Sequence, residues 1–118
     1  MDKQYTVYEI THLPSGRRYI GYTGLLLFTR FGAHYLASRL NYKDGDIIVK
    51  GNPSMELHRL MSTVPDEMFW SSFYVRPLYI TKDREDAKKV EREFIKNYNT
   101  VYPNGLNSKH GRKPKSEA

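Results

Sequence analysis

The chain has the length and composition of one globular domain. It holds 118 residues, of which 39% are hydrophobic and 27% charged, a balance that suits a soluble domain with a modest core. No apolar stretch approaches the roughly 20 residues of a membrane span. Cysteine is absent, which excludes disulfides, thiolate metal sites and cysteine nucleophiles and fits a reducing cytoplasm.

The basic charge favours a polyanionic partner, most simply nucleic acid. The formal net charge is +6, and residues 109–118 supply half of it. They lack an apolar pattern, so we expect a folded domain at 1–108 and a flexible basic tail or linker at 109–118. A basic tail on an ordinary soluble domain explains the charge equally well. The basic side chains of the tail are Lys109, Arg112, Lys113 and Lys115.

The first elements are predicted to form a β-hairpin. Residues 4–11 are rich in β-branched and aromatic types, which predicts a strand, and residues 17–23 predict the returning strand. Between them, Leu13-Pro14-Ser15-Gly16 is a turn signal.

Two helices are predicted next. Residues 25–40 have helical periodicity, and polar residues 41–51 predict a loop with a short extended piece at 47–49. Asn52 and Pro53 suggest the cap and first position of a second helix. The expected apolar faces are Leu27, Phe28, Phe31, Tyr35 and Leu36 on the first helix and Leu57, Leu60, Met61 and Val64 on the second.

The last elements are a strand and a long helix. Residues 68–80 are the most strand-like stretch, in which Pro77 indicates an edge strand, a bulge or a break. Residues 81–99 predict a helix with acidic residues near its start and basic ones later, as the helix dipole favours. The order β-β-α-α-β-α predicts a small α/β sandwich, with a three-stranded, mainly antiparallel sheet flanked by helices.

Glu91 is the most informative single residue. It lies on or beside the apolar stripe of the last predicted helix, and a partly desolvated carboxylate needs a cation or a metal as partner. Two interpretations stay open: a metal ligand, or a boundary carboxylate paired with a basic neighbour. The stripe consists of Ala87, Val90, Phe94 and Tyr98.

Four further side chains can carry chemistry. Arg30 and His34 share a helix face, where an arginine fork suits phosphate and histidine can transfer protons, although a solvated helix face explains them too. Tyr8 and Tyr19 stand on neighbouring strands. Two phenols there can orient a water, and one can act as a base if its pKa falls, but aromatic packing across the hairpin is the simpler explanation.

Other types of site are not supported. The sequence has no glycine-rich phosphate loop, no zinc-type histidine spacing and no Gly-x-Ser-x-Gly elbow. Any metal must therefore be held by carboxylate, imidazole or water, which suits magnesium or manganese.

The hairpin residues resemble the signature of the GIY-YIG nuclease family. The second half is intact as Tyr19-Ile20-Gly21, and the first stands as Thr6-Val7-Tyr8, with threonine where the family usually has glycine. Arg30 follows nine residues after Gly21, one residue later than is usual. His34 follows one helical turn further, as in several phage members.

The resemblance extends over residues 5–107. The segment from Glu91 to Asn99 resembles the helix that carries the family's catalytic glutamate; Glu93 is a rival, but it points about 200° further round the helix. Residues 103–107 resemble the closing motif, with Leu106 in place of tyrosine and the family asparagine at Asn107.

This resemblance implies a GIY-YIG-like fold and metal-dependent hydrolysis of DNA phosphodiester bonds, with one Mg²⁺ or Mn²⁺ at Glu91. Arg30 would stabilise the developing charge, and Tyr8 would orient or deprotonate the attacking water. Tyr19 would position that water or the phosphate, and His34 would assist. Gly21 and Asn107 are expected to support the site.

Phage and mobile-element members of this family often carry a DNA-binding region after the nuclease domain. We therefore expect a homing-type catalytic domain, with residues 109–118 opening a linker. DNA contacts are expected from Arg30, His34, Lys109, Arg112 and Lys113. A non-catalytic nucleic-acid-binding module on the same fold is the alternative.

Overall fold

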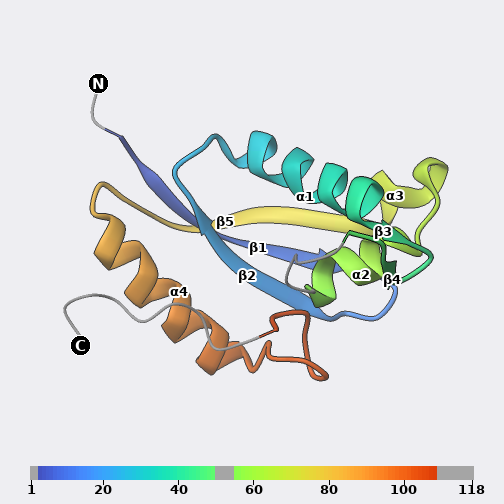
Figure 1. Ribbon diagram of the computed structural model, residues 1–118. Helices are drawn as coiled ribbons and strands as arrows, with labels where there is room; N and C mark the ends of the chain where they lie inside the picture. The colour runs from blue at the N-terminus through green and yellow to red at the C-terminus, as the bar shows by residue number, and fades with distance from the viewer. Residues whose placement is uncertain (1–2, 50–54, 109–118) are drawn as a thin grey trace.

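A computed structural model describes residues 3–49 and 55–108 as an α/β fold with a three-stranded antiparallel sheet. The strands stand in the order β2-β1-β5. Helices α1, α2 and α3 cover one face of this sheet, and α4 covers the other (Figure 1). The bounds are β1 Tyr5–His12, β2 Arg18–Thr23, α1 Leu27–Asn41, β3 Tyr42–Lys43, β4 Asp46–Ile47, α2 Glu56–Ser62, α3 Asp66–Ser72, β5 Phe73–Thr81 and α4 Arg84–Tyr98.

The predicted hairpin is confirmed as β1 and β2. Its register places Tyr8 opposite Gly21 and Ile10 opposite Tyr19. Gly16 closes the turn with φ +73°, a left-handed conformation that glycine adopts without steric cost. Because side chains alternate along a strand, Tyr8 and Tyr19 point to the same face of the sheet.

The prediction for residues 68–80 was right about the strand and wrong about its start. Residues 66–72 form α3, since Pro65 precedes the helix and two acidic residues occupy its first turn, both of which favour a helix start. The strand begins at Phe73. It is an edge strand, and its register shifts where Val7 pairs Tyr79 and Tyr8 pairs Pro77. Pro77 therefore lies beside a bulge on an edge strand, as its missing N–H requires.

The apolar stripe predicted for α1 was partly wrong. Phe28 and Leu36 are 79% and 55% exposed, whereas the buried positions of the helix are Phe31, His34 and Ser38. These three share one helical face at spacings of three and four. The periodicity misled because two of the three buried side chains are polar.

The predicted loop at 41–51 contains a short hairpin, β3–β4. Asp44 and Gly45 form its turn with positive φ, the combination that a two-residue hairpin turn requires. The second helix begins at Glu56 with Met55 as its cap residue. The predicted cap at Asn52 and Pro53 lies outside the described residues.

The last predicted helix is confirmed as α4, which begins and ends with capping residues. The Asp83 side chain accepts a hydrogen bond from the Glu85 N–H, and Asn99 ends the helix in the left-handed conformation. Its buried residues are Ala87, Lys88, Glu91 and Ile95. The expectation that Glu91 is desolvated is confirmed, since this residue is 8% exposed.

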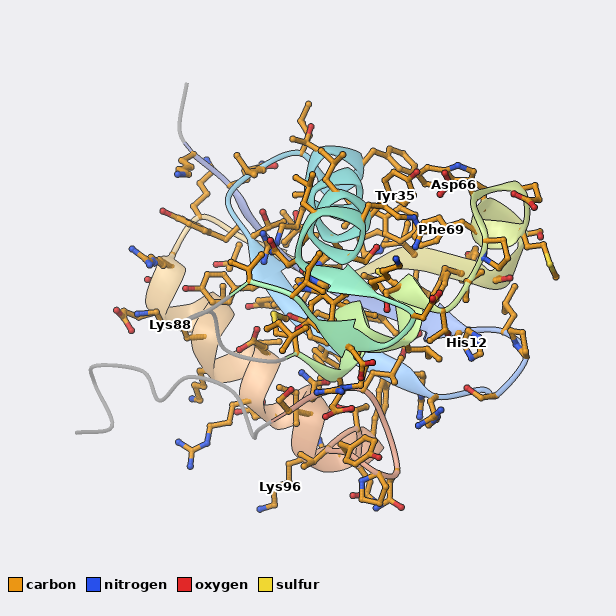
Figure 2. The ribbon with its side chains drawn as sticks, turned by 45° about the vertical axis from the view of Figure 1, so that its right-hand side comes forward. His12, Tyr35, Asp66, Phe69, Lys88 and Lys96 are labelled. Carbon is orange, nitrogen blue, oxygen red and sulfur yellow. The ribbon has the colours of Figure 1, made fainter. Side chains whose placement is uncertain are left out.

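Arg39 fixes α1 to the segment that joins α2 and α3. Its guanidinium donates to the carbonyls of Met61 and Val64 and to the Asp66 carboxylate, which also accepts from Tyr35. Tyr35, Asp66 and Phe69 gather between α1 and α3, away from α4 with Lys88 and Lys96 (Figure 2).

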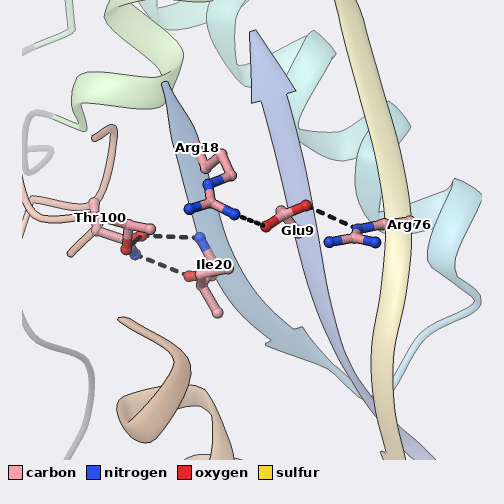
Figure 3. Close-up of polar contacts among 6 residues, drawn as sticks. Glu9, Arg18, Ile20, Arg76 and Thr100 are labelled. Atoms are coloured by element: carbon pink, nitrogen blue, oxygen red, sulfur yellow. Dashed lines mark hydrogen bonds and ion pairs between the residues drawn. The ribbon is translucent and has the colours of Figure 1, made fainter. Parts of the chain in front are cut away.

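Glu9 is the most deeply buried carboxylate among the described residues, at 3% exposed. It lies between two arginines, at 3.2 Å from Arg18 Nη1 and 2.9 Å from Arg76 Nε (Figure 3). Both arginines belong to the strands beside β1, so this ion triplet ties all three strands together.

We predict that Glu9→Ala lowers the free energy of unfolding by roughly 1–3 kcal/mol, because two arginines lose their shared acceptor. The change is smaller than for a fully buried pair, since Arg18 and Arg76 are 35% and 47% exposed. Urea denaturation measures it. Glu93→Ala is the control, because that glutamate is exposed on α4; equal effects of both changes would contradict the assignment.

Candidate active site

Tyr8 and Tyr19 lie side by side on the sheet face that α1 covers. Their ring centroids are 6.2 Å apart. Tyr8 is 1% exposed, and Tyr19 is half-buried. Gly21 makes room for both, because a Cβ atom there would lie 2.7 Å from the Tyr8 hydroxyl and 2.9 Å from the Tyr19 ring. Glycine at 21 is therefore a steric requirement for this placement of the two phenols.

Tyr8 begins a chain of three buried side chains. Its hydroxyl lies 2.6 Å from His34 Nε2, and His34 Nδ1 lies 2.8 Å from His58 Nε2. His34 is 1% exposed and His58 is 8% exposed. The chain crosses from β1 through α1 to α2, so three elements fix its geometry.

Arg30 and Glu91 act electrostatically on the same phenols. Arg30 lies one turn before His34 on α1, and its positive charge lowers the pKa of Tyr8. The charges of Arg30 and Glu91 both act on the pKa values of Tyr8 and Tyr19. The five residues that we predicted to be catalytic are Tyr8, Tyr19, Arg30, His34 and Glu91. Tyr8, Tyr19 and His34 are in mutual contact, and the charges of Arg30 and Glu91 act on both phenols.

The electrostatics correct one expectation. A base role for tyrosine requires a lowered pKa, yet burial raises the pKa of Tyr8, and Arg30 offsets this only in part. Burial also raises the pKa of Tyr19 well above its ordinary value. Both phenols therefore carry their protons at neutral pH, and Tyr8 can accept a proton only if it passes its own to another group.

The two histidines are neutral. Burial and then the charge of Arg30 lower the pKa of His34 to about 2 and that of His58 to about 4. An unprotonated imidazole can accept a proton from Tyr8. The same burial and Arg30 charge that keep the histidines neutral also weaken them as bases.

Asn107 holds the strand that carries Tyr19 and Gly21. Its amide accepts from the Ile20 N–H and donates to the Ile20 carbonyl, both at 2.8 Å, and Thr100 donates to the same amide oxygen (Figure 3). Since β2 is an edge strand, these bonds satisfy backbone groups that no strand would pair. Asn107 therefore supports β2 through the backbone of Ile20.

The tail residues of the predicted DNA contact, Lys109, Arg112 and Lys113, lie outside the described residues.

His58 was missed by sequence reasoning. Its only signal was a polar residue between two core positions, Leu57 and Met61, on the apolar face of α2.

Glu91 is the residue with the chemistry to hold a divalent cation here. No group of three or more His, Asp or Glu side chains suited to a metal occurs within residues 3–49 and 55–108. Mg²⁺ does not need one, because it retains several waters and is commonly bound through one or two carboxylates plus substrate phosphate. A single buried carboxylate whose charge acts on two phenols fits that pattern.

A separate pocket of about 240 Å³ lies between α2 and the segment at 102–106. Arg17, Arg59 and Tyr102 are among its lining residues, and none of the five clustered residues is. This pocket is therefore separate from the cluster of predicted catalytic residues.

The chain matches no family model, no curated protein and no solved structure. In the part of the chain that the structure describes, no helix is both long and apolar enough to cross a membrane.

Glycine 21 yields a test of the packing. We predict that Gly21→Ala destabilises the fold by roughly 1–3 kcal/mol, because the added methyl displaces Tyr8. The control is Gly32→Ala on α1, where a Cβ meets nothing within 4 Å and alanine should stabilise the helix by up to about 1 kcal/mol. Urea denaturation of both variants should give opposite signs; two changes of the same sign would contradict the geometry.

The buried histidines yield a pH dependence. In the unfolded chain they protonate near pH 6.5, whereas the folded values are about 2 and about 4. Below pH 6.5 the unfolded state therefore binds more protons, and stability must fall as the pH drops toward 4. We expect His58→Gln to flatten this decline in urea titrations between pH 6.5 and 4. An unchanged slope would show that His58 is not held neutral.

Proposed function

We propose that this chain is a metal-dependent DNA endonuclease of the GIY-YIG type. The observation that carries the proposal is the convergence of Tyr8, Tyr19, Arg30, His34 and Glu91. These residues come from β1, β2, α1 and α4, and packing alone gives no reason for an arginine, a carboxylate and a histidine to meet two phenols there.

The charges of the cluster suit a phosphodiester. Arg30 is half-buried, so its charge is weakly screened and can act on an anion at the surface. Its fork can donate to the oxygens of the phosphate as negative charge develops on them in the transition state. A divalent cation at Glu91 would add positive charge at the phosphate and lower the pKa of a bound water.

Tyr8 and His34 can handle the proton of the attacking water. The water oxygen bonds to phosphorus while the bond to the leaving sugar oxygen breaks. The water proton moves to the Tyr8 oxygen, the Tyr8 proton moves to His34 Nε2 across 2.6 Å, and the leaving oxygen takes a proton from solvent. Tyr8 is thus a proton relay, which its raised pKa permits.

Binding of the substrate assists this relay. The charge of Arg30 lowers the pKa of His34, and the negative charge of a bound phosphate offsets that of Arg30. His34 then becomes a stronger base when DNA is present than when it is absent. Tyr19 packs beside Tyr8, with ring centroids 6.2 Å apart, and helps to hold the Tyr8 ring in place.

We further propose a phage or mobile-element origin of the homing type. The support is the basic composition of residues 109–118, which favours binding to phosphates. A cytoplasmic location belongs to the same proposal and rests on the absence of cysteine.

The test is nicking of supercoiled plasmid with Mg²⁺ or Mn²⁺. We expect cleavage by the wild type, none with EDTA, and losses of about 10²–10³-fold for Arg30→Ala and Glu91→Gln, because each removes charge that acts at the transition state. Glu93→Gln and Arg84→Ala are the matched controls, since both residues are exposed on α4, and both variants should retain activity.

Equal nicking by the wild type and all variants would contradict the assignment of Arg30 and Glu91 as catalytic residues. If every protein, wild type included, fails to cleave but binds duplex DNA in a salt-sensitive way, the chain is instead a non-catalytic nucleic-acid-binding module.

A further inference from the structure

His58 has no part in the proposed reaction, yet it occupies a defined place beside it. It is 8% exposed, lies on α2 between the buried Leu57 and Met61, and touches the only histidine that contacts Tyr8 among the described residues. Its Nε2 atom lies 2.8 Å from His34 Nδ1, so the partner of this buried imidazole is the histidine that contacts Tyr8.

The hydrogen bonds around Tyr8 set the direction of the chain. The Tyr8 oxygen lies 2.6 Å from His34 Nε2, which is shorter than the roughly 2.7–3.2 Å of N–H···O bonds and falls within the roughly 2.5–3.0 Å range of hydroxyl donors. The contact is therefore the donation of the Tyr8 proton to His34. His34 Nε2 is then the acceptor, and the single proton of neutral His34 is on Nδ1.

The second contact follows from the first. With its proton on Nδ1, His34 donates to His58 Nε2. We infer that His58 is a positioning residue, which accepts the Nδ1 proton of His34 and so fixes the tautomer and ring orientation that present Nε2 to Tyr8. This inference rests on the proposed nuclease function. The arrangement follows the general pattern in which a third group orients the base of a catalytic pair.

The surroundings hold His58 rigidly enough for this role. Arg39 donates to the Met61 carbonyl and Arg59 donates to the Gly45 carbonyl, so α2 is tied both to α1 and to the β3–β4 turn. The ring of His58 also packs edge-on near the Tyr42 ring, with centroids 6.3 Å apart.

Burial lowers the pKa of both His34 and His58, so both imidazoles are neutral before the reaction. When His34 takes the proton of Tyr8, its Nδ1–H bond to His58 becomes charge-assisted and hence stronger. His58 thus stabilises the imidazolium form of His34 without touching the substrate.

The test measures the tautomer of His34 directly, on protein without DNA or metal. Long-range ¹H–¹⁵N spectra of protein labelled in histidine separate the Nδ1–H from the Nε2–H form near pH 7.5. His58→Gln keeps a carbonyl acceptor for the His34 N–H, whereas His58→Leu removes it. Circular dichroism and urea unfolding report whether each variant folds, and plasmid nicking with Mg²⁺ gives the turnover.

We expect His34 as the Nδ1–H tautomer in the wild type and in His58→Gln, and a loss of that preference in His58→Leu. In the nicking assay, kcat should fall roughly 10–100-fold in His58→Leu, with little change in KM, and His58→Gln should restore most of it.

A wild-type His34 in the Nε2–H form would overturn the inference, as would a folded His58→Leu variant with unchanged tautomer and turnover. If His58→Leu does not fold, His58→Gln decides, and loss of the Nδ1–H form there would also overturn the inference. A wild type with the expected tautomer but no cleavage would support the role of His58 in fixing His34 and would count only against the nuclease.

Discussion

The placement of the Tyr8 hydroxyl is the constraint on which the rest of the site depends. The Tyr8 hydroxyl lies over Gly21, and it leaves no room for a side chain at position 21 of the neighbouring strand. Its proton goes to His34, because the 2.6 Å distance to His34 Nε2 fits a hydroxyl donor. That contact sets the tautomer of His34 and gives His58 its acceptor role. A glycine and two histidines are thereby linked to one buried phenol.

This arrangement buries polar groups that a core would otherwise exclude. His34 and Ser38 occupy α1 positions that apolar residues normally fill, while Phe28 and Leu36 remain exposed. Burying polar groups is unfavourable unless each finds a hydrogen-bond partner, and no buried side-chain nitrogen or oxygen in the described part of the chain is without one. A helix that departs from its apolar pattern in this way is typical of a functional site.

Local sequence patterns predicted the hairpin, the edge position of the Pro77 strand and the helix of Glu91, because turn residues, caps and periodicity act over short distances. They failed for α3, where the aromatic content of residues 68–72 suggests a strand although the acidic first turn favours a helix. The raised pKa of Tyr8 and the contact of His58 with His34 depend on packing between distant segments. No spacing in the sequence carries that information, although the resemblance did lead to the five residues that converge.

The proposed reaction requires a phosphate to meet Arg30 and Tyr19, and an NMR titration measures that binding most directly. The variant Glu91→Gln, expected to be inactive, would be titrated with a short DNA duplex at low salt. We expect the largest changes in chemical shift on the Arg30 side chain, on Tyr19 and on Gly21. Changes confined to Arg17 and Arg59 in the separate pocket, with none at Arg30, would contradict it.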